Sequence, residues 1–455
     1  MTALLSRAIR GEGLMARAFR SSAITVMGFG ASQAIRLASN LILTRLLFPE
    51  AFGMMAIVGV FLMGLAMFSD VGVGPSIMGS ARGDEPDFLD TAWTIQIARG
   101  LILLVIALAL TWPMAAFYGE PDLLAYLPVA ALSLAISGFN PTRAETANRH
   151  LRAGRVTLIE IAVQVVGIVV AVGLAWATRS VWALVLSGVA GALANLLFLN
   201  LFLPGSRNRL RWEPAAAQEL IHFGKWIFLS TFCGFAIGQA DKVILGRFLD
   251  LGHFGVYNIG FFLASFPWLL GGVVMRRVLI PVYRQSPPAD SDENFRRVRR
   301  MRAAGTGVLA AMVMALAFGG DWLVSVLYDA RYHAAGGIVV LIAVMQMPAL
   351  VIMTCDQAAL AAGDSRRFFW FTAVRAATVT GGILIGWHLG GLPGAIVGQG
   401  LGNLACYPAL GWLLRPHRAW DWKLDAVFGI IGLGFGAVAL WLNAGAVAAL
   451  GAMAG

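Results

Sequence analysis

The chain has 455 residues, of which 59% are hydrophobic and only 13% are charged. Soluble domains carry about 25% charged residues, so this composition excludes an ordinary soluble enzyme or binding module. The apolar residues come in blocks of about 20, the length that an α-helix needs to cross a membrane. We therefore predict an all-α polytopic membrane protein.

The first 20 residues hold four arginines among apolar side chains at roughly helical spacing. They lack the compact apolar core of a cleaved signal peptide. The segment 1–20 fits a short amphipathic helix on the cytoplasmic membrane surface, and it fits a disordered tail equally well.

Thirteen apolar blocks are predicted to be membrane helices. Six fall in an N-terminal lobe, 21–203, and six in a C-terminal lobe, 218–415, with a cytoplasmic linker, 204–217, between them. The segment 416–455 holds a thirteenth helix and an apolar tail, and whether 444–455 form part of a fourteenth helix stays open. The blocks lie near residues 22–47, 53–79, 92–116, 122–147, 154–178, 180–203, 219–248, 254–281, 301–319, 336–361, 368–389, 392–414 and 424–443.

Proline and glycine predict irregular points within these blocks. Kinks are expected at Pro267, Pro281 and Pro348, because a proline removes a helix hydrogen bond. Glycines at 394, 398 and 402 form a GxxxGxxxG stripe, which predicts close packing against another helix.

The basic residues fix the predicted orientation. With a cytoplasmic N-terminus, the cytoplasmic tail, loops and helix ends hold 26 of the 34 Lys and Arg residues, whereas the outer side holds four. This bias is the positive-inside rule. It also explains the net charge of +10, so no nucleic-acid partner is predicted.

An internal repeat links the two lobes. LILTRLLFPEAFG at 41–53 returns as VILGRFLDLGHFG at 243–255, and six of the thirteen positions are identical. A repeat with an even number of helices predicts two lobes in the same orientation, related by an axis along the membrane normal.

Several stretches together resemble the polysaccharide-biosynthesis flippases, the Wzx-like exporters of the multidrug/oligosaccharidyl-lipid/polysaccharide exporter superfamily. They are ASNLILTRLLFPEAFGMMAIVGVF, FSDVGVGPSIM, NRHLRAGRVTLIEIA and FGKWIFLSTFCGFAIGQADKVILGRFLDLGHFGVYNIG. Within that family the sequence is most similar to the exopolysaccharide or colanic-acid exporters. The resemblance implies two six-helix bundles in a V around a central cavity. It implies transfer of an undecaprenyl-diphosphate-linked oligosaccharide from the cytoplasmic to the periplasmic leaflet of the bacterial inner membrane, without cofactor or catalysis.

Polar residues inside the predicted helices are the candidate substrate site, because a buried charge in a membrane usually faces protein or a water-filled cavity. Arg36 shares one face of the first helix with Gln33 and Asn40, and at the repeat offset Asn40 aligns with Lys242, beside Asp241. Arg99 and Arg375 suit a diphosphate, because guanidinium matches phosphate oxygens. For each of these residues, structural pairing or snorkelling to the interface is the alternative.

Two acidic residues are candidates for coupling to a cation or proton. Asp70 lies beside Gly72, Gly74 and Pro75, where a helix is weakened, and Asp356 is a weaker candidate of the same kind. The alternative for Asp70 is a helix cap.

Arginines at the lobe bases form a predicted cytoplasmic rim that captures the diphosphate, unless the positive-inside rule alone explains them. They are Arg143, Arg149, Arg276 and Arg277.

Catalytic readings find little support, because the histidines form no metal spacing and the chain has no phosphate-binding loop. The alternative function is a drug-cation antiporter of the same architecture, and a membrane glycosyltransferase or polymerase is a weaker third. Lipid-linked oligosaccharide, membrane lipids and polysaccharide-assembly proteins are the expected partners. The glycan, the energy source and the oligomeric state are not predicted.

Overall fold

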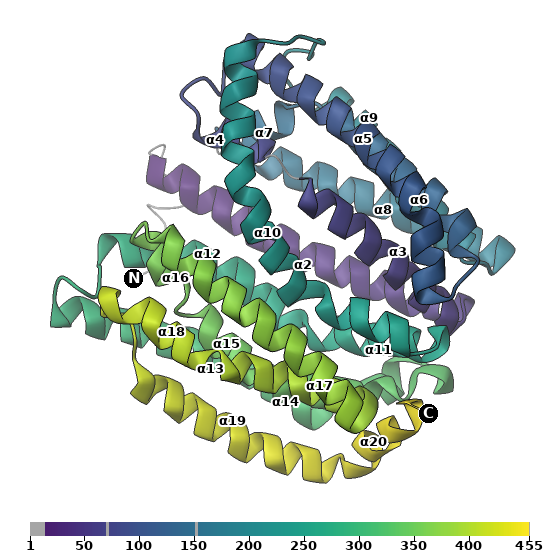
Figure 1. The fold of residues 1–455 in the computed structure, drawn as a ribbon, viewed down its shortest axis with the longest axis vertical. Coiled ribbons are helices and arrows are strands. Elements are labelled where there is room, and N and C mark those ends of the chain that lie inside the picture. Colours follow the sequence, from purple (N-terminus) through teal and green to yellow (C-terminus); the bar gives the residue numbers. More distant parts are fainter. Residues whose placement is uncertain (1–13, 70–71, 151–152, 455) are drawn as a thin grey trace. The chain divides into compact units, whose positions relative to one another are not determined.

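A computed structural model describes residues 14–69, 72–150 and 153–454, and for 14–26, 153, 221–230, 276–278 and 454 it describes the backbone alone. Those residues are helical throughout, apart from short turns and loops (Figure 1). They divide into two compact units. The first contains the chain up to Phe48 and 57–232, and the second contains Pro49–Ala56 and Cys233–Gly455.

The first unit is built from helices that pair along the chain. α5 packs on α6 and α8 packs on α9, while α2 lies against α8 and α6 against α9. Its helices are α2 (Leu14–Leu46), α3 (Pro49–Phe68, shared with the second unit), α4 (Val73–Gly79), α5 (Pro86–Tyr118), α6 (Leu123–Gly138), α7 (Arg143–Arg149), α8 (Ala153–Thr178), α9 (Trp182–Phe202) and the first part of α10 (Pro214–Phe248).

The second unit contains a core of buried apolar residues from α12, α13, α14, α15, α16, α17, α18 and α19. α13 packs on α14 and α19, and α14 also contacts α11 and α17. Its elements are α11 (Leu251–Ala264), α12 (Phe266–Gln285), α13 (Asp292–Leu327), η1 (Ala330–Tyr332), α14 (Ala335–Met345), α15 (Met347–Met353), α16 (Gln357–Ala361), α17 (Ser365–Ala405), α18 (Tyr407–Leu414), η2 (Arg415–His417), α19 (Trp422–Leu442), α20 (Ala444–Ala449) and η3 (Leu450–Ala454).

The apolar blocks correspond to these helices with several differences. Among the described residues, eight helices are long and apolar enough to cross a membrane, or ten if two bent pairs count as one span each. α2 runs without interruption from Leu14, so the predicted boundary at residue 20 falls inside it. The tail after α19 is a short helix and a 3-10 turn, α20 and η3.

One kink predicted from proline is confirmed, and a second proline lies at a break between two helices. Pro267 lies in the first turn of α12, directly after the end of α11, and Pro348 lies in the first turn of α15. The chain bends by 46° between α14 and α15. Pro281 lies inside α12, which continues through it.

The glycine stripe packs as predicted. A Cβ on Gly398 would collide with the carbonyl of Gly382, and one on Gly402 would lie 2.7 Å from the Cα of Val379. Gly394 approaches Gly386 in the same way, so α17 is an antiparallel hairpin that reverses at the non-helical Gly390 and Gly391. The hairpin accounts for two of the predicted spans.

The two copies of the repeat meet inside the second unit. A Cβ on Gly53 would collide with the carbonyl of Leu251 and lie 3.2 Å from the nitrogen of Gly255. A Cβ on Gly255 would collide with the carbonyl of Pro49 and lie 3.1 Å from the nitrogen of Gly53. Since Pro49 aligns with Leu251 in the repeat, the contact is reciprocal, as in a two-fold interface.

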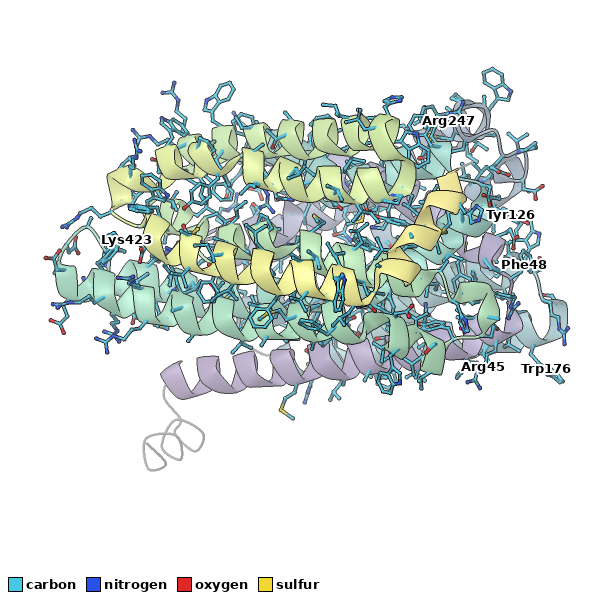
Figure 2. All side chains as sticks on the ribbon, turned by 90° about the horizontal axis from the view of Figure 1, so that it is seen from below. Arg45, Phe48, Tyr126, Trp176, Arg247 and Lys423 are labelled. Atoms are coloured by element: carbon cyan, nitrogen blue, oxygen red, sulfur yellow. The ribbon has the colours of Figure 1, made fainter. Side chains whose placement is uncertain are left out.

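Within each unit, several charged and aromatic side chains lie at helix ends. Figure 2 shows Arg45, Phe48, Tyr126 and Trp176 gathered at one end of the first unit. In the second unit, Arg247 and Lys423 lie at opposite ends (Figure 2).

Candidate functional site

A cavity of about 80 Å³ lies inside the second unit, between α10, α11, α12, α14 and α17. Apolar walls include the rings of Phe261 and Trp268. The polar side chains that line it are Arg375, Asn403, Gln399, Gln346 and Ser265. Of the residues predicted for the substrate site, Arg375 is the one that lines this cavity.

Arg375 is held in place by the α17 hairpin, which brings it beside Asn403. Its side chain is 8% exposed, and its Nε donates to Asn403 Oδ1 at 3.0 Å. The Asn403 amide in turn donates to the Gln399 carbonyl at 3.0 Å. Within the described part of the chain, no carboxylate forms an ion pair with Arg375.

Asp241 and Lys242 have different partners, as expected for adjacent residues on a helix. The Tyr257 hydroxyl donates to Asp241 Oδ2 at 2.6 Å, and Asp241 is 2% exposed. Lys242 Nζ donates to Gln239 Oε1 at 3.1 Å and lies 4.0 Å from the centre of the Phe261 ring. Because Phe261 also lines the cavity, a second positive charge lies against its wall.

Some side chains of the polar face predicted on α2 pack against other helices, and others are exposed. The Ser32 hydroxyl donates to Gln164 Oε1 on α8 at 2.6 Å, and Gln33 is buried. Asn40 is half-buried and Arg36 is exposed. No described residue forms an ion pair with Arg36, so its guanidinium is a free positive charge at mid-helix.

Arg99 closes the end of α3. Its Nη2 donates to the Ala66 carbonyl at 2.5 Å, and its Nε donates to the Ser69 hydroxyl at 2.9 Å. Carbonyls in the last turn of a helix have no partner within it, so a guanidinium there satisfies them and complements the helix dipole. The guanidinium of Arg99 is thus engaged inside the first unit.

The two coupling candidates differ in how they are placed. Asp70 lies outside the described residues, but its neighbours confirm a helix break: α3 ends at Phe68, and Gly72, at φ 66°, precedes α4. Only glycine adopts such a left-handed conformation without strain. Asp356 is 7% exposed, precedes α16 and accepts from Gln357 Nε2 at 2.9 Å.

Two of the rim arginines use their donors within the first unit. Arg143 donates to the carbonyls of Asn200, Leu203 and Ser206, at the end of α9. Arg149 donates to Asp84 Oδ2 at 3.0 Å and to carbonyls at the end of α4. The side chains of Arg276 and Arg277 are outside the description.

Asp84 also accepts from His150 at 2.8 Å. This hydrogen bond, with the charge of Arg149, lowers the pKa of the Asp84 carboxyl below its usual value. Asp84 thus links the loop after α4 to the end of α7 through its contacts with Arg149 and His150.

Sequence reasoning missed a buried ion pair. Arg302 on α13 donates to Asp425 Oδ1 on α19 at 2.7 Å, and their side chains are 2% and 5% exposed. The Tyr407 hydroxyl donates to Asp425 Oδ2 at 2.8 Å. Each charge lies at the second position of a predicted apolar block, 301–319 or 424–443. Charged residues at these two positions were the sequence signal for a pair.

These features define a multi-pass helical membrane protein with charged residues inside its helices and two units joined through α10. The chain belongs to the family described as "Polysaccharide biosynthesis protein", whose model matches residues 42–336. It is 21% identical over 376 residues to the succinoglycan biosynthesis transport protein ExoT of Rhizobium meliloti (strain 1021), covering 82% of this chain and 75% of that protein. It is 21% identical over 251 residues to the lipopolysaccharide biosynthesis protein WzxC of Escherichia coli (strain K12), covering 53% of this chain and 49% of WzxC.

Solved structures show the same fold at low sequence identity. The lipid II flippase MurJ in an inward closed conformation aligns with a TM-score of 0.66 and 11% identity, covering 92% of each chain. An inward-facing multidrug resistance MATE family transporter aligns with a TM-score of 0.62 and 15% identity, covering 85% of this chain and 95% of the transporter. The chain therefore shares its fold with both transporters, and the family match confirms the resemblance noted from the sequence.

Proposed function

We propose that the chain is a flippase for an undecaprenyl-diphosphate-linked oligosaccharide of the exopolysaccharide or O-antigen type. It moves this lipid from the cytoplasmic to the periplasmic leaflet of the bacterial inner membrane by alternating access, with its N-terminus in the cytoplasm. Membership in the polysaccharide biosynthesis family supports the substrate class. The names of the relatives, a succinoglycan transport protein and a lipopolysaccharide biosynthesis protein, support it as well.

One structural observation carries the proposal. Arg36 and Lys242 lie within long apolar helices, and neither of them is paired with a carboxylate among the described residues. A positive charge inside a membrane protein is costly unless something anionic meets it. A lipid diphosphate supplies that charge during transport, whereas a cationic drug does not.

The predicted substrate residues take different parts in this proposal. Arg36 and Lys242 attract the diphosphate, with Gln33, Asn40 and Asp241 shaping the polar surface near them. Arg99 supports the end of α3, since its donors are already engaged there. Asp70 and Asp356 remain the candidates for coupling to a cation or proton, and Arg276 and Arg277 for the cytoplasmic rim.

The antiporter alternative has one observation in its favour, which is the fold that the chain shares with a multidrug resistance transporter. A cavity for cations needs accessible carboxylates. Asp241, the buried carboxylate of α10, is 2% exposed and accepts a hydrogen bond from Tyr257. A cation in solution therefore has little access to it.

Complementation of a flippase-null strain with a defined glycan pathway tests the function. The wild-type chain should restore surface polysaccharide, and Arg36→Ala should lower the export rate about tenfold, as for loss of one charge-assisted hydrogen bond. Arg45→Ala, at the exposed end of the same helix, is the matched control and should stay active. Normal export by well-expressed Arg36→Ala and Asp241→Ala would refute the site, and failure of the wild type with every undecaprenyl-linked glycan would refute the function.

A further inference from the structure

The guanidinium of Arg375 is buried and incompletely satisfied. Its one hydrogen bond within the described residues is from Nε to Asn403, which leaves both Nη groups without an acceptor. The side chain is 8% exposed and lines the cavity of the second unit. A buried charge without a counter-charge destabilises a protein by several kcal/mol.

No acidic side chain of the second unit balances this charge directly. Asp356 and Arg375 both lie within electrostatic range of the Cys355 and Cys406 thiols, but no ion pair joins them. The second unit's undescribed side chains include no acid, since 276–278 read Arg-Arg-Val. Lys242, stacked on Phe261 at 4.0 Å, adds a further positive charge beside the same cavity.

The cavity has the size and the donors for a small anion. Its volume is about 80 Å³, and a water molecule needs about 10–15 Å³ of such space, so the cavity holds a small ion together with water. The Gln399 side-chain amide also lines it and has no hydrogen-bond partner within the described residues, so it supplies further N–H donors.

We propose that this cavity binds a small inorganic anion of the chloride class, held by the Nη groups of Arg375 and the amide of Gln399. The anion is a resident counter-charge that stabilises the second unit. It is not the transported substrate, so this inference does not depend on the proposed function. It assigns to Arg375 a role separate from those of Arg36 and Lys242.

Anion-dependent stability of the purified full-length protein tests the proposal. Thermal unfolding in detergent is followed through the reaction of a fluorogenic thiol reagent with the buried Cys233, Cys355 and Cys406. Chloride added to gluconate buffer at constant ionic strength should raise Tm by several degrees and then saturate, because a ligand that binds the folded state stabilises it. Equal Tm values in the two salts would overturn the proposal.

Two variants make the test specific. Arg375→Gln should lose the chloride response, whereas Arg36→Gln, which removes an exposed arginine of α2, should keep it. Asn403→Asp places a carboxylate at the position that accepts from Arg375 Nε at 3.0 Å. This variant should be as stable in gluconate as the wild type is in chloride. A chloride response that persists in Arg375→Gln would place the anion elsewhere.

Pyrophosphate separates the two sources of anionic ligand. We expect that pyrophosphate in gluconate buffer does not replace chloride in raising Tm. If pyrophosphate replaced chloride and bound more tightly, the cavity would be a substrate diphosphate site and the inference would fail. Crystals soaked in bromide should show an anomalous peak beside Arg375, and a peak only at the surface would count against the site.

Discussion

The buried pair of Arg302 and Asp425 predicts a large and specific loss of stability. Asp425→Leu leaves the guanidinium, 2% exposed, with one hydrogen bond, from Nη1 to the Ala419 carbonyl at 3.3 Å. Its Nε already has no acceptor within the described residues. Removing one partner of a buried pair costs about 3–5 kcal/mol, so we expect the free energy of unfolding to fall by that amount.

The double variant isolates the charge from the packing. In Arg302→Met with Asp425→Leu, neither charge of the pair remains, and apolar residues of similar volume are often neutral or stabilising at such sites. Most of the lost stability should therefore return. Tyr407→Phe, which removes only the hydroxyl that donates to Asp425 at 2.8 Å, should cost about 1 kcal/mol.

Arg418 is the matched control for this prediction. It pairs with Asp292, in the first turn of α13, at 3.1 Å, and their side chains are 59% and 79% exposed. An exposed pair contributes about 0–1 kcal/mol, so Arg418→Met should change little. Unfolding in mixed detergent, followed by tryptophan emission, gives the free energies. If Asp425→Leu cost no more than Arg418→Met, or if the double variant stayed as unstable as the single one, the reasoning would be refuted.

Three further predictions concern helix contacts and pH. Gly255→Ala should lower the free energy of unfolding by about 1–3 kcal/mol, because the added Cβ collides with the Pro49 carbonyl. Gly59→Ala is the control, since Gly59 has open space around it, and thermal unfolding compares the two variants. Arg99→Gln should lower stability by about 1.5–3 kcal/mol by removing the charged donor at the end of α3, measured by the same unfolding. Asp84 has a lowered pKa, so its contribution is present above the unfolded value of about 3.9 and is lost as pH falls through the folded pKa. Asp84→Asn should flatten that acid limb of a stability–pH curve.

The sequence predicted breaks and close contacts well where one residue type decides them. Gly72 marks the break before α4, and Pro267 and Pro348 open new helices, because each residue restricts or frees the backbone locally. The glycines at 394 and 398 predicted close packing for the same reason. The start of α2 was harder to predict, because arginines are good helix formers and do not interrupt a helix that begins at Leu14.

The partners of the intramembrane charges were not predictable in this way. Helical spacing says which residues share a face, but it does not say which neighbouring helix covers that face. Arg99 and Arg375 looked equivalent in the sequence, yet one closes the end of α3 and the other lines a cavity. The pairing of Arg302 could not be predicted either, because its partner Asp425 lies 123 residues away in the sequence.

Where the two copies of the repeat differ, both members of an interacting pair of side chains are replaced together. Asp241 and its donor Tyr257 align with Ser39 and Met55, so the first copy lacks both the carboxylate and the hydroxyl that satisfies it.

Lys242 and Phe261 align with Asn40 and Gly59, so the ammonium and the ring beneath it are absent together as well. By contrast, Gly53 and Gly255 are identical, and they are the residues that touch. A buried charge is tolerated only with its partner, so a change at one position without the other would destabilise the protein. The charged centre of the second unit is therefore a property of several residues at once, and replacing Lys242 alone tests its charge without removing the ring that supports it.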